Sequence, residues 1–292
     1  MSSRFKHTAK SWMPPALVGL ARRLVTAIRQ ERPEWEYVPE GWARAQSDAK
    51  IKGWNVESVL EAYKARWPAF VHQLEGTAPL GISPESPTPE QSDLAFHNTL
   101  MIFAYALALA TRTKNAISML DWGGGIGHYY LIGKTLVPGL DIDYHCKDTP
   151  ALIEYGKKLF PQAHFCADES CLARRYDFVL ASTSLHYSED WPAVLAGLAR
   201  ATDGYLLVTQ LPVTSKSPSF VFVQRPYRYG YNTEYLGWCL NQTEFLARAQ
   251  AAEMELLREF LIGHQIPIAH APGPCEYRAF LFRPRTSHVN RR

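Results

Sequence analysis

From residue 117 onward, short apolar runs alternate with helical patterns along the chain. This alternation is typical of a parallel sheet that helices cover on both faces. Five runs predict its strands, at residues 117–121, 141–146, 163–167, 176–182 and 204–210. Two later runs, 254–263 and 276–283, have no helical pattern between them and predict a terminal antiparallel pair. The pattern therefore predicts an α/β fold.

The residues before this region have a different pattern. Residues 1 to about 75 read as helical and are rich in tryptophan, and residues 76–91 are rich in Pro, Ser, Gly and Thr, as in a linker. A long apolar helix, buried nearly all round, is expected over residues 94–110. We therefore divide the chain into a helical cap with linker (1–92), a main domain (93–285) with an aromatic lid insertion (213–240), and a basic tail (286–292).

Composition limits the class of protein. Of the 292 residues, 47% are hydrophobic and 20% are charged, which excludes a wholly disordered chain. The longest apolar run, Leu100 to Ala110, is about half the length that a bilayer requires, so no transmembrane segment is expected. Five cysteines without a CxxC pair argue against a metal site and fit a reducing compartment, so we expect a cytoplasmic protein.

The basic residues are concentrated at the N-terminus. Residues 1–30 contain six lysines and arginines and no acid, so the rest of the chain is mildly acidic although the whole has a net charge of +3. An acidic body argues against a nucleic-acid partner. Pro14, Pro15 and the apolar stripe up to Ile28 predict a helix that packs on its own domain. A transit peptide and an interfacial membrane helix stay open as alternatives.

The segment between the first strand and its helix contains the pattern Asp121-x-Gly123-x-Gly125-x-Gly127. A dinucleotide site would need a third glycine at position 128, where the chain has His128. A carboxylate at Asp121 would also repel a pyrophosphate, whereas it would attract the ammonium and sulfonium groups of S-adenosylmethionine. The pattern favours S-adenosylmethionine over a nicotinamide cofactor.

Further polar residues follow the next strands. Asp148, after the second strand, is placed to accept hydrogen bonds from both ribose hydroxyls, and Thr149 with Pro150 predicts a helix start. Asp168, after the third strand, is expected to contact the adenine amino group, although it could instead cap a short helix. The predicted cofactor-binding residues are Asp121, Gly123, Gly124, Gly125, Gly127, Asp148, Thr149, Asp168 and Ser182.

These motifs resemble those of class I S-adenosylmethionine-dependent methyltransferases. Segments 12–15, 120–129, 184–191 and 223–226 are similar, more closely, to a family of methyltransferases associated with bacterial surface-polysaccharide genes. The resemblance covers nearly the whole chain. It implies a Rossmann-like sheet of seven strands in the order 3-2-1-4-5-7-6, with the seventh strand antiparallel, and methyl transfer to a small molecule or a glycan precursor.

Candidate acceptor groups follow the fourth and fifth strands. His186 is the first candidate for a general base, with a purely structural histidine as the alternative. Tyr227, Tyr229 and Tyr231 alternate as on one face of a strand, and with Arg225 they predict an aromatic lid for a sugar or an anionic acceptor. An edge hairpin that stacks on the N-terminal tryptophans is the alternative. The predicted substrate-binding residues are His97, Tyr187, Arg225, Tyr229, Tyr231 and Trp238.

The leading hypothesis is therefore methyl transfer from S-adenosylmethionine to an oxygen or nitrogen atom. The sequence contains no unmistakable base, so a non-catalytic domain that binds the cofactor stays open, and a nicotinamide oxidoreductase is less favoured. Nothing in the sequence indicates the oligomeric state.

Overall fold

The computed structural model describes residues 32–86 and 92–285. The chain divides into two compact units, residues 1–34 and 35–292, and the sheet, its helices and its cavities all belong to the second unit. The predicted N-terminal helix and the predicted basic tail lie outside the described residues. The predicted domain boundaries stay a prediction.

Within the described residues, ten strands form one mixed sheet. Seven of them pair in this order: β4 (His164–Cys166), β3 (Asp141–Lys147), β2 (Ala116–Trp122), β5 (Tyr176–Ser182), β6 (Thr202–Thr214), β10 (Cys275–Pro284) and β9 (Met254–Ile266). The first five are parallel, and β10 is antiparallel to both β6 and β9. These seven have the expected pairings, but the prediction of a seven-stranded sheet is wrong, because three more strands continue from β6.

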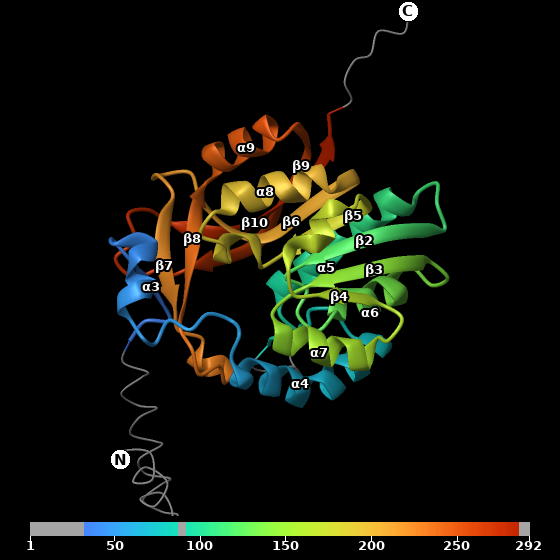
Figure 1. Cartoon of the computed structure of the whole chain (residues 1–292), viewed down its shortest axis with the longest axis horizontal. Helices are drawn as coiled ribbons and strands as arrows, with labels where there is room; N and C mark the ends of the chain where they lie inside the picture. Colours follow the sequence, from blue (N-terminus) through green and yellow to red (C-terminus); the bar gives the residue numbers. More distant parts are fainter. Residues whose placement is uncertain (1–31, 87–91, 286–292) are drawn as a thin grey trace, which may run out of the picture. The chain divides into compact units, whose positions relative to one another are not determined.

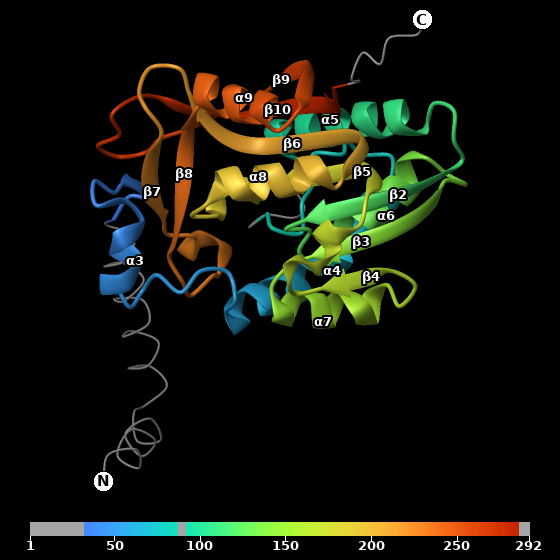
Figure 2. The same cartoon turned by 45° about the horizontal axis from the view of Figure 1, so that its top comes forward.

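The additional strands lie at the opposite end of the sheet from β4 (Figures 1 and 2). β8 (Tyr235–Asn241) pairs in parallel with the end of β6, β7 (Phe220–Gln224) is antiparallel to β8, and β1 (Trp35–Tyr37) is antiparallel to β7. The prediction that residues 1 to about 75 are helical is therefore wrong for residues 35–37, which form strand β1. A three-residue strand is too short to show a period in the sequence, and it is extended because β7 supplies its hydrogen bonds.

Helices precede and connect the strands of the sheet. Before the sheet come η1 (Gly41–Ala43), α3 (Arg44–Ser47), α4 (Glu57–Glu75) and α5 (Leu94–Thr111); within it come α6 (His128–Leu136), α7 (Pro150–Leu159), η2 (Glu169–Ala173), η3 (Leu185–Tyr187), α8 (Trp191–Arg200), η4 (Tyr227–Tyr229) and α9 (Gln242–Ala251). Figure 1 shows α8 beside α9, and α4 beside α7.

Successive residues of the central strands point into two different cores, as the two-residue period of a strand requires. Met119 and Phe178 pack with α5 and α6 on one face, whereas Leu120 and Val179 pack with α8 and α9 on the other. Because β2, β3 and β5 are parallel, their carboxyl ends share one edge of the sheet, where the glycine loop lies.

Helix α5 is long and apolar enough to cross a membrane, by length and composition alone. Leu100, Phe103 and Leu107 on this helix are buried in the same core as β2 and β5. A core helix passes the same test of length, so α5 does not show a transmembrane segment.

Candidate functional site

The glycine loop joins the end of β2 to α6 and folds over β3. The N–H of Gly123 donates to the carbonyl of Lys147 at 2.8 Å, and the N–H of Gly125 donates to Oδ2 of Asp148 at 2.8 Å. Gly123, Gly125 and Gly127 have positive φ values of 74°, 60° and 87°, which side chains with a Cβ rarely adopt. Glycine is therefore required for the path of this loop.

A cavity of about 170 Å³ lies beside the loop, and we call it the donor cavity. Four of the predicted cofactor residues line it: Gly123, Asp148, Thr149 and Ser182. The other residues of its lining are Trp54, Tyr63, Glu85, Trp122, Lys147, Leu152, Thr183, Ser184, Tyr187 and Ser188. The edge of the sheet that the glycine motif predicts as a binding site is thus a cavity.

Two groups in the donor cavity are suited to bind hydroxyls. The carboxylate of Asp148 accepts from the N–H of Gly125 and, at 2.6 Å, from the N–H of Thr149. Burial raises the pKa of Asp148, and these two hydrogen bonds partly oppose the shift. Oγ1 of Thr149 is buried without a hydrogen-bond partner among the described residues. Such an orphaned atom gains a partner when a polar ligand enters.

Asp121 has a different position from the predicted one. Its side chain is fully buried and does not line the donor cavity. Oδ2 accepts from the hydroxyl of Tyr144 at 2.5 Å, while Oδ1 has no partner among the described residues. A Cβ on Gly124 would lie only 2.5 Å from Cγ of Asp121. The carboxylate therefore lies beneath the loop, and the direct contact of Asp121 with the cofactor stays a prediction.

Gly124, Gly125 and Gly127 do not line the donor cavity either, and they contribute the shape of the loop. Asp168 is exposed at the start of η2, where it accepts from the N–H of Ser170 at 3.0 Å. Asp168 does not line the donor cavity, and the alternative interpretation as a helix cap describes its observed hydrogen bond.

A second cavity of about 240 Å³, the acceptor cavity, adjoins the first. Its lining is largely aromatic: Trp35, Trp54, Phe96, Tyr187, Tyr229, Tyr231, Tyr235 and Tyr277. Trp54, Glu85, Thr183 and Tyr187 line both cavities. A third cavity of about 20 Å³ is lined by Glu85, Thr183, Gly123 and His128, among others. The donor and acceptor cavities thus share a wall, as a transfer between two bound molecules requires.

Of the predicted substrate residues, Tyr187, Tyr229 and Tyr231 line the acceptor cavity. Tyr227 and Tyr229 belong to the 3-10 turn η4, so the expected strand alternation is wrong. The aromatic segment also matches the alternative interpretation, because β7 and β8 form an antiparallel hairpin and Trp54 stacks on Tyr235 at 4.4 Å between ring centroids.

The structure does not bring Arg225, Trp238 and His97 to the acceptor cavity, and their contacts with a substrate stay a prediction. The Arg225 guanidinium is 2% exposed and pairs with Glu36 at 2.7 Å and with Glu234 at 3.4 Å. Nε1 of Trp238 donates to the carbonyl of Glu189 at 3.2 Å. The hydrophobic period and the charge of a segment do not reveal which of its side chains form ion pairs or hydrogen bonds with neighbouring elements.

His186, the predicted base, is not brought to any of the three cavities. Its imidazole is fully buried, and neither ring nitrogen has a hydrogen-bond partner among the described residues. Burial lowers the pKa of His186 to about 3. These surroundings match the alternative interpretation, a structural histidine.

Thr183 and Gln210 line the acceptor cavity but were not among the predicted site residues. Both lie in strained backbone. Their φ values are 52° and 50°, and the Thr183 hydroxyl donates to Oε1 of Gln210 at 2.5 Å. Strain of this kind is enriched at functional sites. No residue type marks it in the sequence, because both residues ordinarily adopt negative φ.

Glu85 was not among the predicted site residues either, because it lies within residues 76–91, whose composition is typical of a linker. Its carboxylate lines all three cavities and accepts from the hydroxyl of Tyr63 at 2.5 Å. Burial raises the pKa of Glu85, and the charge of Asp148 adds to the shift, while the Tyr63 hydrogen bond opposes it. An acid between two glycine- and proline-rich segments was the only signal in the sequence.

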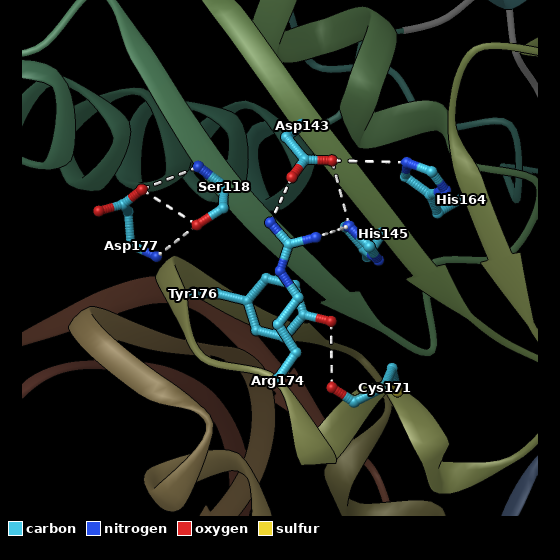
Figure 3. Close-up of polar contacts among 8 residues, drawn as sticks. All are labelled: Ser118, Asp143, His145, His164, Cys171, Arg174, Tyr176 and Asp177. Carbon is cyan, nitrogen blue, oxygen red and sulfur yellow. Dashed lines mark hydrogen bonds and ion pairs between the residues drawn. The ribbon is translucent and has the colours of Figure 1, made fainter.

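One group outside these cavities has the spacing of a metal site. Asp143, His145 and His164 place three ligand atoms within 4.8 Å of one another on β3 and β4. Figure 3 shows the Arg174 guanidinium against two of them, and it donates to Asp143 and, at 2.8 Å, to Nε2 of His145. A metal ion would have to displace the Arg174 guanidinium from this group. We therefore place the candidate functional site at the cavities and not at this group.

Comparison with known proteins identifies the family of the chain. Residues 97–256 match the model of a family described as "Methyltransferase domain". No curated protein matches the chain in sequence.

Several solved structures are similar to parts of this chain. An N1-methyltransferase of 1,6-didemethyltoxoflavin from Burkholderia thailandensis, solved with S-adenosylhomocysteine, is 16% identical over 65% of this chain and 80% of its own, with a TM-score of 0.42. An S-adenosylmethionine-dependent methyltransferase from Clostridium acetobutylicum is 10% identical over 65% and 91%, with a TM-score of 0.43. The CcbJ methyltransferase from Streptomyces caelestis is 11% identical over 69% and 93%, with a TM-score of 0.46.

Proposed function

The chain belongs to the methyltransferase domain family, and on that premise we propose that it transfers a methyl group from S-adenosylmethionine to an oxygen or nitrogen atom of a small molecule or glycan precursor. The observation that carries the proposal is the wall of Trp54, Glu85, Thr183 and Tyr187 between the two cavities. One cavity borders the glycine loop, and the other is aromatic. A donor and an acceptor bound there would be neighbours.

The residues of the donor cavity fit S-adenosylmethionine. Gly123 lines this cavity, and the orphaned hydroxyl of Thr149 provides a polar partner for a nucleoside. Burial raises the pKa of Asp121, Asp148 and Glu85, and the charge of Asp148 raises those of the other two further. A cation relieves this repulsion, whereas a pyrophosphate would increase it.

When bound, S-adenosylmethionine supplies a methyl group that its sulfonium already activates. The protein's contribution is mainly positional, because the acceptor atom, the methyl carbon and the sulfur must be collinear. Holding two reactants in this way is worth roughly 7–11 kcal/mol of the barrier. Asp148 would hold the ribose side, and the aromatic wall would hold the acceptor and exclude water.

Location and biological context belong to this proposal as well. All five cysteines are free, which supports a reducing compartment such as the cytoplasm. The resemblance of the sequence motifs supports an acceptor in surface-polysaccharide synthesis. Solution measurements of mass on the full chain would determine the oligomeric state.

Calorimetry tests the donor cavity with a matched pair of variants. Asp148→Ala should weaken the binding of S-adenosylmethionine by about 1–3 kcal/mol, because charged hydrogen bonds are lost. Asp168→Ala removes the same side chain from an exposed helix cap and should leave the affinity unchanged.

Equal affinities of the two variants would remove Asp148 from the site. If the wild-type protein binds neither S-adenosylmethionine nor S-adenosylhomocysteine, the proposed function fails. Turnover of labelled S-adenosylmethionine with a pool of cell-extract acceptors then separates an enzyme from a domain that only binds the cofactor.

A further inference from the structure

Glu85 has a position that no other carboxylate in the described residues shares. It lines the donor, acceptor and small third cavities together. The Arg66 guanidinium donates to the carbonyl of Glu85 at 3.1 Å and to the carbonyl of Tyr229 at 2.7 Å, so its donors are directed at backbone oxygens. Among the described residues, no lysine or arginine forms a direct ion pair with the Glu85 carboxylate, although the charge of Arg66 lowers the pKa of Glu85 from a longer distance. The carboxylate therefore has room for a directly bound cation in the cavity.

Aromatic rings surround this position on the acceptor side. Trp54 lies edge-on to Tyr187 at 5.2 Å and to Tyr231 at 5.9 Å between centroids, and it stacks on Tyr235 at 4.4 Å. All four rings line the acceptor cavity with Glu85. Aromatic faces around a carboxylate are a common way to bind an ammonium group, because the ring quadrupole and the charge act together.

We propose that the acceptor is an amine, which Glu85 and the aromatic rings of Trp54, Tyr187, Tyr231 and Tyr235 bind as an ammonium ion, and that Glu85 removes its proton. This inference rests on the proposed function and names the substrate class of the same site. A hydroxyl acceptor would leave the partly buried Glu85 carboxylate without a directly bound cation, since Arg66 acts on it only from a longer distance. An ammonium ion supplies a direct charged partner.

The chemistry balances in two steps. A proton passes from the ammonium nitrogen to the carboxylate of Glu85, which leaves a lone pair on nitrogen. That lone pair forms the new bond to the methyl carbon, while the electron pair of the carbon–sulfur bond goes to sulfur and neutralises the sulfonium. The product is a methylated ammonium and S-adenosylhomocysteine.

The test of recognition uses two probes of equal shape, n-butylammonium and n-butanol. Each is titrated into the full chain saturated with S-adenosylhomocysteine, and the fluorescence of the cavity tryptophans Trp35 and Trp54 reports binding. We expect n-butylammonium to bind about tenfold or more tightly than n-butanol. Glu85→Gln, which keeps an acceptor for Tyr63, should abolish this preference. Glu75→Gln, at the exposed end of α4, should keep it.

The outcomes separate this inference from the proposed function. Because Glu85 also lines the donor cavity, the fold of Glu85→Gln is checked by its circular-dichroism spectrum, and each protein is titrated at its own saturating concentration of S-adenosylhomocysteine. Equal binding of the two probes by the wild-type chain, no binding of either, or a preference that survives in Glu85→Gln overturns the inference while the methyltransferase proposal stands. Failure of S-adenosylhomocysteine to bind the wild type overturns the methyltransferase proposal itself.

A product readout tests the proton step. Labelled S-adenosylmethionine is incubated with cell-extract acceptors, and the methylated product is identified by mass spectrometry. We expect an N-methyl group, with turnover about a hundredfold lower in Glu85→Gln, as for loss of a general base. An O-methyl product, or wild-type turnover in Glu85→Gln, would exclude proton removal from an amine by Glu85.

Discussion

The imidazole of His186 lies inside the protein, with its ring centroid 3.9 Å from that of Tyr187 and 6.5 Å from that of Phe222. Burial lowers its pKa to about 3, from an ordinary value of 6.5. The side chain therefore stays neutral at physiological pH and cannot reach an acceptor. For this residue, burial outweighs the intrinsic chemistry of the side chain.

The pKa of His186 has a consequence for stability. As the pH falls below 6.5, the unfolded chain takes up a proton that the folded chain excludes down to about pH 3, so the folded state loses stability over this range. His186→Leu removes the loss. Between pH 7 and pH 5 the wild type should lose about 2 kcal/mol more than the variant in urea unfolding. Parallel losses in the two proteins would contradict burial of a neutral imidazole.

Arg225 shows the same principle for a cation. Its charge made it a candidate for an anionic acceptor, yet Glu36 of β1 and Glu234 before β8 pair with it. The ion pair ties β1 to the turn between β7 and β8. A charge that the fold already neutralises is not available to a ligand.

Among the elements, β6 connects the core sheet to the additional strands. The first part of β6 pairs with β5, and Val213 and Thr214 near its end pair with β8. Between them the register against β10 shifts, and Gln210 has a positive φ of 50°. Such a bulge bends a strand and changes the direction of a side chain. Gln210 thereby lines the acceptor cavity.

The glycine loop is the element whose packing is easiest to test. A Cβ at Gly124 would meet Cγ of Asp121 at 2.5 Å and Sγ of Cys146 at 2.8 Å, and neither of these buried groups can move freely. Gly124→Ala should lower the free energy of unfolding by about 1–3 kcal/mol and weaken cofactor binding. Gly76→Ala, where the nearest atom is 3.4 Å away, is the control. Equal effects of the two substitutions would refute the close packing of the loop on Asp121.

At the scale of the whole molecule, the fold gathers negative charge at one place. Asp121 comes from β2, Asp148 follows β3, and Glu85 lies between α4 and α5. Burial raises the pKa of Asp121 to about 7, and the charges of Asp148 and Glu85 add to this shift. The cofactor-free protein therefore bears a cost that a bound cation would offset.

This cost depends on pH with a definite sign. The unfolded chain ionises Asp121 near pH 3.8, whereas the folded chain does so near pH 7, so stability falls as the pH rises between these values. Asp121→Asn removes the fall. Its gain in free energy of unfolding over the cofactor-free wild type should grow by roughly 2–3 kcal/mol from pH 5 to pH 8. A gain that is independent of pH would show that Asp121 is not buried as an acid.

Much of the fold could be predicted from the sequence, because the relevant signals are local. The two-residue period of the central strands, the 3.6-residue period of their helices and the Gly123-x-Gly125-x-Gly127 spacing are set by near neighbours in the chain. They determined the α/β class, the antiparallel terminal pair β9–β10 and the edge of the sheet with the donor cavity, and the resemblance of the motifs indicated the methyltransferase family.

Only the tertiary structure decided which side chains face the cavities. Glu85, Thr183 and Gln210 come from segments far apart in the chain, and their convergence depends on the bulge in β6 and the packing of α4 on the glycine loop. The burial of His186 and the ion pair of Arg225 could not be predicted for the same reason, since residues distant in the chain set both. A local pattern records which face a residue takes on its own element, and not what the rest of the chain places against it.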